Sequence, residues 1–263
     1  MRPVRLGAVS YLNTKPLVHG LEARPDLFSV RFDVPAVCAT LLHQGGVDVG
    51  LIPAIEYGRR AYEIVPDVAI GSNGPIASVA LFSRVSIAKV QSIALDISSN
   101  TSVALTRILC AKRWGIRPRF RPGVPDLTIM LSQADAALLI GDPALAIDAD
   151  AFGALKIDLG SEWLALTGLP FVYAVWAGRA GALSAEHVRE LQSARDRGVC
   201  DIETIARSAA GGDATRAARA LVYLRDNLKY GLGSAERAGL SRFHELAAEL
   251  GVGPAKRSLR FYE

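Results

Sequence analysis

The sequence predicts an α/β protein with two lobes, a ligand cleft between them and a helical C-terminal tail. Short apolar stretches alternate with helical stretches up to about residue 178, which is typical of open α/β sheets. Two apolar stretches, at 76–84 and 171–178, enclose a complete α/β unit. We therefore expect residues 1–84 and 171–263 to form the first lobe and residues 85–170 the second.

The first lobe is expected to begin with alternating strands and helices. Apolar runs such as "VRLGAV" and "VDVGLIP" read as strands, because each is short and ends at a polar residue or a proline. The helix that starts at Pro35 is expected to stop at Gly45 and Gly46, since glycine is a common helix terminator. The expected strands are 3–9, 28–35, 47–53, 67–72 and 76–84, and the expected helices are 15–23, 35–46 and 55–64.

The second lobe repeats the pattern, and the tail is helical. A strong helix is expected over 98–115, because its start is rich in the short polar residues that cap helices. Its neighbours are predicted strands at 90–96, 117–123 and 134–142, with a helix at 126–133. Beyond the strand at 171–178, helical spacing with glycine stops predicts helices within 184–198, 201–211, 213–233 and 240–251.

Composition narrows the function classes. The 263 residues carry a net charge of +4, but Arg and Lys are scattered, so we expect no nucleic-acid partner. Three distant cysteines favour a reducing compartment, and four histidines without zinc-ligand spacing predict no metal. Polar residues at Ser10–Lys15 interrupt the first apolar run too early for a signal peptide. We expect a cytoplasmic protein that does not bind membranes. The sequence does not predict its oligomeric state.

Two polar clusters stand where strands give way to helices. Ser10, Tyr11 and Asn13 follow the first strand, and one of them would suffice to cap a helix. Ser99, Thr101 and Ser102 open the helix at 98–115. They either cap that helix or, with its free N–H groups, hold an anion in the cleft. Because ligands bind at such strand ends in open α/β sheets, both clusters are candidates for ligand contact.

Three further residues are candidates on the same grounds. Ser78 interrupts an apolar strand and is either a buried hydroxyl or a ligand contact. Gly141 ends a strand of the second lobe, where it can let the backbone approach a ligand. Asp142 either braces a loop or touches substrate. Large aromatic residues such as Trp163, Trp176 and Phe171 are expected in the core.

Six stretches carry a resemblance to a known family. They are, in order, "SYLNTKPL", "GGVDVGLIPAIEY", "GSNGPIASV", "DISSNTS", "LIGDPAL" and "DLGSEWLALTGLPFVYAVW". In this order and spacing the sequence resembles the chorismate dehydratases of menaquinone biosynthesis, over nearly the whole chain. The resemblance implies a two-lobed fold like that of type II periplasmic binding proteins, working as a cytoplasmic enzyme of the futalosine pathway.

The resemblance also implies a reaction. Chorismate would lose its ring hydroxyl and a neighbouring ring hydrogen to give 3-[(1-carboxyvinyl)oxy]benzoate and water, without a cofactor. Asn13 and Ser78 would act in catalysis by orienting the leaving hydroxyl, and the other candidates would bind substrate. The base would be Glu56, Asp142 or a carboxylate of the substrate itself. A 1,4-dihydroxy-6-naphthoate synthase-like enzyme and a non-catalytic solute-binding protein remain as alternatives.

Overall fold

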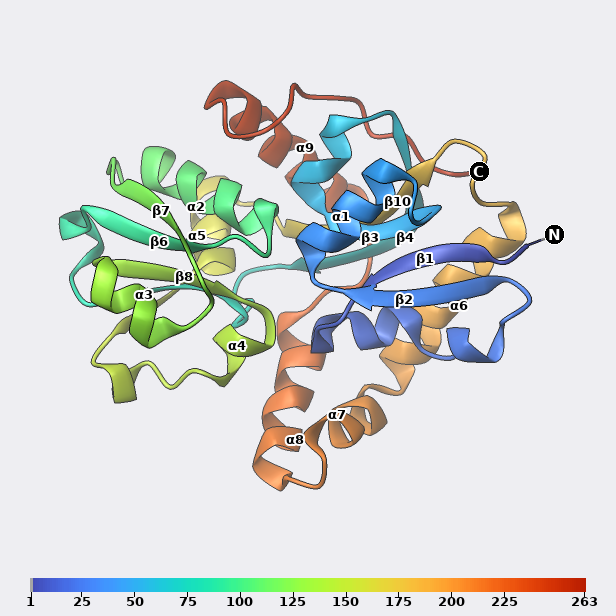
Figure 1. Cartoon of the computed structure of the whole chain (residues 1–263), viewed down its shortest axis with the longest axis horizontal. Helices are drawn as coiled ribbons and strands as arrows, with labels where there is room; N and C mark the ends of the chain where they lie inside the picture. Colours follow the sequence, from blue (N-terminus) through green and yellow to red (C-terminus); the bar gives the residue numbers. More distant parts are fainter. Residues whose placement is uncertain (1) are drawn as a thin grey trace.

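The computed structural model describes residues 2–263 as two lobes, each built on a five-stranded sheet (Figure 1). The first sheet has the order β2-β1-β3-β10-β4, and its strands are β1 (Val4–Val9), β2 (Phe28–Asp33), β3 (Val49–Pro53), β4 (Tyr62–Ser72) and β10 (Phe171–Arg179). The second has the order β7-β6-β8-β5-β9, and its strands are β5 (Val79–Ser83), β6 (Ser92–Asp96), β7 (Arg119–Gly123), β8 (Ala136–Ile140) and β9 (Leu155–Asp158). The predicted α/β class is confirmed.

Helices surround both sheets, and a helical tail completes the chain (Figure 1). The first lobe contains α1 (Pro35–Gln44), α6 (Ala185–Cys200), α7 (Ile202–Ala210), α8 (Ala214–Val222) and α9 (Ser234–Glu249). The second contains α2 (Asn100–Lys112), α3 (Leu127–Gln133), α4 (Gly141–Ala146) and α5 (Leu159–Thr167). Short 3-10 segments add η1 (Leu12–Val18), η2 (Leu21–Ala23), η3 (Ala54–Arg59), η4 (Ile87–Lys89) and η5 (Asp150–Phe152), and a π-helical turn, η6 (Tyr223–Asn227), extends α8.

The structure does not form the regular helix expected over 15–23. Two short 3-10 segments, η1 and η2, replace it. Pro16 lies inside η1 and has no N–H to donate, and Gly20 adopts a left-handed conformation with φ of 79°. Both features stop a regular helix from forming. The helix expected over 55–64 is likewise shortened to η3, because β4 already begins at Tyr62.

The two sheets divide the strands at a different point from the predicted lobe boundary. Strand β5 pairs antiparallel with β8 and β9, so it belongs to the second sheet. A boundary drawn from the sheets therefore falls before Val79 rather than after residue 84. Strand β10 returns antiparallel between β3 and β4 and closes the first sheet. Two connections thus join the lobes, one between β4 and β5 and one between α5 and β10.

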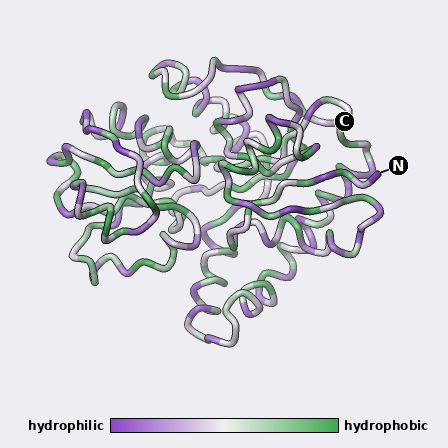
Figure 2. The backbone as a smooth tube through the Cα atoms, in the orientation of Figure 1, coloured by the Kyte–Doolittle hydropathy of each residue, from purple (hydrophilic) through white to green (hydrophobic). Residues whose placement is uncertain are grey.

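Buried aromatic and aliphatic side chains fill the core. The expected core residues Trp163, Trp176 and Phe171 are at most 1% exposed. The Phe171 ring packs edge-on against the rings of Trp163 and Phe243, which ties α5, β10 and α9 together. Hydrophobic segments coincide with the central strands of both lobes (Figure 2). None of the helices in residues 2–263 has the length and apolar character that a membrane span requires.

His244 makes stability depend on pH. It is 1% exposed on α9 beside the rings of Tyr57 and Phe243, and burial lowers its pKa from 6.5 to about 4. As the pH falls below 6.5, His244 becomes protonated in the unfolded chain but stays neutral in the folded chain. The free energy of unfolding therefore decreases as the pH falls from 6.5 to about 4. The protein is expected to lose roughly 2 kcal/mol from this residue between pH 7 and pH 5.

Urea unfolding at the two pH values measures this effect. Replacing the imidazole in His244→Leu should remove most of that loss, although the variant itself can be less stable at pH 7. An equal loss in wild type and variant would show that other groups set the pH dependence.

Candidate active site

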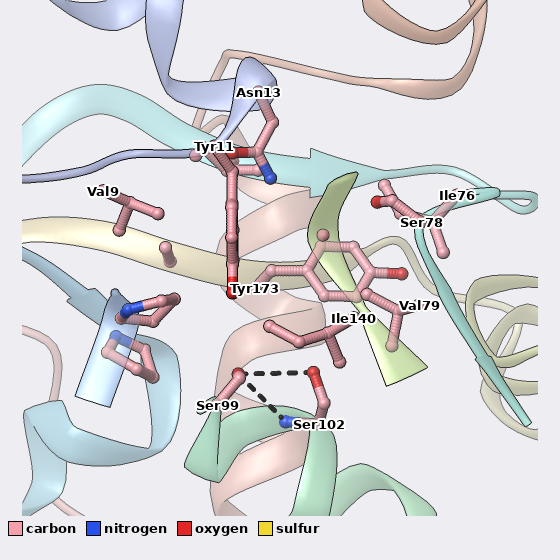
Figure 3. Close-up of a pocket in the computed structure, with 15 residues that line it drawn as sticks. Val9, Tyr11, Asn13, Ile76, Ser78, Val79, Ser99, Ser102, Ile140 and Tyr173 are labelled. Carbon is pink, nitrogen blue, oxygen red and sulfur yellow. Dashed lines mark hydrogen bonds between the residues drawn. The ribbon is translucent and has the colours of Figure 1, made fainter. Parts of the chain in front are cut away.

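A cavity lies between the two lobes, and residues of both lobes form its walls (Figure 3). The cavity is narrow in this structure: the space in it that is open to a water-sized molecule is about 40 Å³, below the roughly 300–1,000 Å³ usual for small-molecule sites. Its wall consists of Val9, Tyr11, Asn13, Pro35, Pro53, Ile70, Ile76, Ser78, Val79, Ser99, Ser102, Ile140, Gly141, Tyr173 and Ala174. Among the described residues that line it, none carries a carboxylate, an imidazole, an amine or a guanidinium. Its polar groups are hydroxyls and one amide.

The turn after β1 supplies one wall. Tyr11, which directly precedes η1, and Asn13 within η1 enter on the side of the cavity opposite Ser99 and Ser102 (Figure 3). The Tyr11 hydroxyl lies 3.5 Å from the hydroxyl of Ser98, and burial raises its pKa, so this phenol stays neutral. The neutral ring spans the gap between the lobes and closes one side of the cavity.

Gly141 explains how the Tyr11 ring fits. A Cβ atom on Gly141 would lie 2.7 Å from two carbons of that ring. Gly141 also has a φ of 68°, in the left-handed region that favours glycine. Glycine at this position therefore allows the ring of Tyr11 to pack directly on the start of α4.

A strained turn presents Ser78 to the cavity. The Ser78 N–H donates to the Ile76 carbonyl at 2.8 Å, and Ala77 between them has a φ of 63°, which is costly for a residue other than glycine. The Asp158 carboxylate accepts from the N–H groups of Ile76 and Ala77 and holds the turn in place. The buried Ser78 hydroxyl lies 2.7 Å from the hydroxyl of Tyr223.

The start of α2 forms the opposite wall. Ser99 is the N-cap and accepts from the N–H of Ser102, and the Ser102 hydroxyl donates to Ser99 Oγ at 3.3 Å (Figure 3). The first N–H groups of a helix have no partner within it and carry the positive end of the helix dipole. This wall therefore combines hydroxyl donors with a partial positive charge and suits a carboxylate.

Three hydrogen bonds attach the start of α2 to the first lobe. The Ser98 carbonyl accepts from Ala36 N–H at 3.0 Å, and Thr101 Oγ1 accepts from Ile55 N–H at 3.1 Å. The Asn100 side chain donates to Glu56 Oε1 at 2.9 Å. These contacts cross between the lobes and fix the start of α2 against η3 and α1.

The structure brings together most, but not all, of the predicted site residues. The cavity wall contains Tyr11, Asn13, Ser78, Ser99, Ser102 and Gly141 and lacks Ser10, Thr101 and Asp142. The Thr101 hydroxyl accepts from Ile55 N–H, as described above, and Ser10 is exposed. The Asp142 carboxylate accepts from Leu12 N–H and in this way braces η1. Burial raises the pKa of this carboxyl group.

Glu56, one of the candidate bases, also lies outside the cavity wall. Its buried carboxylate contacts His43 Nε2 at 2.9 Å and Arg59 Nε at 2.7 Å, besides the Asn100 amide. All of its oxygens are therefore engaged by structural partners. This geometry does not fit a base that removes a substrate proton.

Sequence reasoning missed two tyrosines. Tyr173 lines the cavity, with its hydroxyl 3.1 Å from that of Ser72, and Tyr223 lies behind Ser78. Burial raises the pKa of both phenols well above its ordinary value. Tyr173 falls within the stretch "DLGSEWLALTGLPFVYAVW", which carries part of the family resemblance, and Tyr223 falls within the helix expected at 213–233. Within residues 2–263 no group of three His, Cys, Asp or Glu side chains is placed to hold a metal ion.

Comparison with known proteins decides the family. The family model for menaquinone biosynthesis matches residues 4–249. The chain belongs to the menaquinone biosynthesis family. A relative of this family, the chorismate dehydratase of Thermus thermophilus, is 33% identical over an alignment that covers 93% of this chain and 95% of the relative.

Solved structures confirm the fold of this menaquinone biosynthesis family member. A protein from Archaeoglobus fulgidus superposes with a TM-score of 0.74 at 18% identity and covers 95% of this chain and 98% of its own. The periplasmic aliphatic sulphonate binding protein of Escherichia coli gives a TM-score of 0.62 at 18% identity and covers 100% and 92%. The expected fold, like that of periplasmic binding proteins, is thus confirmed.

Proposed function

We propose that this protein is a chorismate dehydratase, which converts chorismate to 3-[(1-carboxyvinyl)oxy]benzoate and water in the futalosine route to menaquinone. The observation that carries the proposal is the cavity, whose polar groups are neutral donors set against a helix N-terminus. The family match and the relative from Thermus thermophilus support it. A cytoplasmic location belongs to the proposal, because an exposed free cysteine such as Cys200 suits a reducing compartment.

The reaction needs one proton removed and one hydroxyl expelled. The electrons of the broken ring C–H bond form the new ring double bond, and the C–O bond breaks with its electrons on the hydroxyl. The hydroxyl and the proton leave together as water, and the ring becomes aromatic. No electrons are gained or lost overall, so the balance requires no oxidant, reductant or cofactor.

We propose that a carboxylate of the substrate removes the ring proton. The cavity wall contributes only amide, serine and tyrosine groups, and burial raises the pKa of Tyr11 and Tyr173, so these phenols keep their protons. The enzyme would then act by holding chorismate in a reactive conformer with its side-chain carboxylate near the ring hydrogen. Asn13 and Ser78 would stabilise the departing hydroxyl with hydrogen bonds.

The start of α2 is proposed to hold the other carboxylate of chorismate. Ser99 and Ser102 face the cavity at a helix N-terminus, where a bound anion is favoured by free N–H groups and by the dipole. Because this interaction exists before and during the reaction, it should contribute mainly to substrate binding.

Removing the Ser102 hydroxyl is expected to weaken substrate binding. Ser102→Ala should raise KM about tenfold with kcat nearly unchanged, because the Ser102 hydroxyl, which otherwise donates to Ser99 Oγ, is expected to turn its proton to the bound carboxylate, and a hydrogen bond to a charged group contributes about 1.5–3 kcal/mol. Steady-state kinetics with chorismate measures both constants. Ser132→Ala, on the exposed face of α3, is the matched control and should leave KM unchanged. Equal KM values in wild type and Ser102→Ala would remove Ser102 from the binding site.

Incubation with chorismate tests the proposed function. Purified protein, treated with a chelator and supplied with no cofactor, should convert chorismate to a product lighter by one water, as identified by mass spectrometry. Binding without turnover would contradict the proposal and favour the solute-binding alternative. Activity that is lost with chelator and restored by metal would contradict cofactor-free catalysis.

A further inference from the structure

Tyr223 is a buried residue that does not line the cavity. Its hydroxyl contacts Ser78, a residue of the cavity wall. Tyr223 is 1% exposed, and its hydroxyl lies 2.7 Å from Ser78 Oγ. The Asn13 side chain lies close to the same hydroxyl and affects its pKa. Tyr223 begins the π-helical turn η6 at the end of α8. Such turns are rare and are found frequently at functional sites. One hydroxyl of the tail thus connects two candidate catalytic residues.

The hydrogen bonds around Tyr223 have a preferred direction. Burial raises the pKa of Tyr223, so the hydroxyl keeps its single proton. The Asn13 Oδ1 atom accepts from the Thr14 hydroxyl at 3.4 Å, and the Asn13 amide N–H groups can donate to Tyr223. Either hydroxyl can donate in the contact between Tyr223 and Ser78; when Asn13 donates to Tyr223, the Tyr223 hydroxyl donates its own proton to Ser78 Oγ. The proton of Ser78 is then free to point elsewhere.

Hydrogen bonds fix the backbone of Ser78, so a neighbouring residue can orient only its hydroxyl group. Its N–H closes the strained turn with Ile76, and its carbonyl accepts from Gly141 N–H at 2.7 Å. The Ser78 side chain lines the cavity (Figure 3). An acceptor bond from Tyr223 on one side of Ser78 Oγ therefore turns the Ser78 proton toward the cavity.

We infer that Tyr223 is a positioning residue, which acts in a chain from Asn13 N–H through Tyr223 to Ser78 and aims the Ser78 hydroxyl at the departing hydroxyl of the substrate. This inference rests on the proposed function. Ser78 donates a hydrogen bond and retains its proton, while the hydroxyl that leaves takes the proton removed from the ring. Because the bond matters most as charge develops on the leaving oxygen, Tyr223 acts on kcat rather than on KM.

Removal of the Tyr223 hydroxyl tests this role. Tyr223→Phe should lower kcat about tenfold, the effect of one lost hydrogen bond at the upper end of its usual range, with KM changed less than about threefold. A double-mutant cycle supplies the decisive readout. In a Ser78→Ala background, Tyr223→Phe should cause no further fall in kcat, because the residue it positions is gone.

Tyr230→Phe is the matched control. The Tyr230 hydroxyl is also buried but has no hydrogen-bond partner among residues 2–263, so its loss should leave kcat unchanged. An undiminished kcat in Tyr223→Phe, or the same fall with and without Ser78, overturns the inference and leaves the proposed function standing. Wild-type protein that leaves chorismate intact overturns the proposed function and the inference together.

Discussion

Asn13→Asp is expected to lower kcat by at least ~100-fold while the protein still folds. The substitution keeps the shape of the side chain but replaces an amide donor with a negative charge. That charge would face a dianionic substrate and a departing hydroxyl inside the cavity. It would also accept a hydrogen bond from the Tyr223 hydroxyl, which reverses the direction inferred above for the bonds that lead to Ser78. Substrate binding should weaken less than turnover does.

Single-turnover kinetics and a thermal melt, compared with wild type, measure the two effects separately. Asn73→Asp is the matched control, because it introduces the same charge at an exposed position outside the cavity wall. The control should turn over normally. A variant Asn13→Asp that melts normally and retains near wild-type kcat would reduce Asn13 to a structural residue of η1.

Local patterns in the sequence account for most of the fold. Apolar runs such as 47–53 and 134–142 became β3 and β8, and the polar start of the helix at 98–115 became the N-cap of α2. The pairing of strands is not a local property. The apolar character of the run at 76–84 does not indicate which lobe the strand joins. Pairing with β8 and β9 places β5 in the second sheet.

The site was predictable where it followed from strand ends, and it was missed where it depended on long-range contacts. Tyr11, Asn13 and Ser99 were found because they lie where a strand ends and a helical segment begins. The direction of each side chain was not predictable: Thr101, one position before Ser102, was expected to meet substrate, but its side chain lies outside the cavity wall and accepts from Ile55 N–H. Tyr223 lies 145 residues from Ser78, and no periodicity within the tail indicates that contact.

Glu56→Ala is expected to destabilise the protein by about 3 kcal/mol. The Glu56 side chain is 3% exposed and engages His43, Arg59 and Asn100. Without the carboxylate, buried polar groups of both lobes lose their partner, and the cost of breaking such a pair is about 3–5 kcal/mol. The lower end applies because the Arg59 side chain is 54% exposed and recovers hydration. For a chain of this size, the fall in Tm should be roughly 6–12 °C.

Thermal melts and kinetics together separate this structural role from catalysis. Glu249→Ala breaks an exposed ion pair with Lys112 and should change the free energy of unfolding by less than about 1 kcal/mol. Glu56→Gln keeps the shape and the bond to Asn100, so it should retain kcat within a few-fold below its melting temperature. If Glu56→Gln melts normally but loses turnover, the carboxylate is the missing base, and the proton is not removed by the substrate. If Glu56→Ala melts like wild type, the contact between Glu56 and α2 does not hold the lobes together.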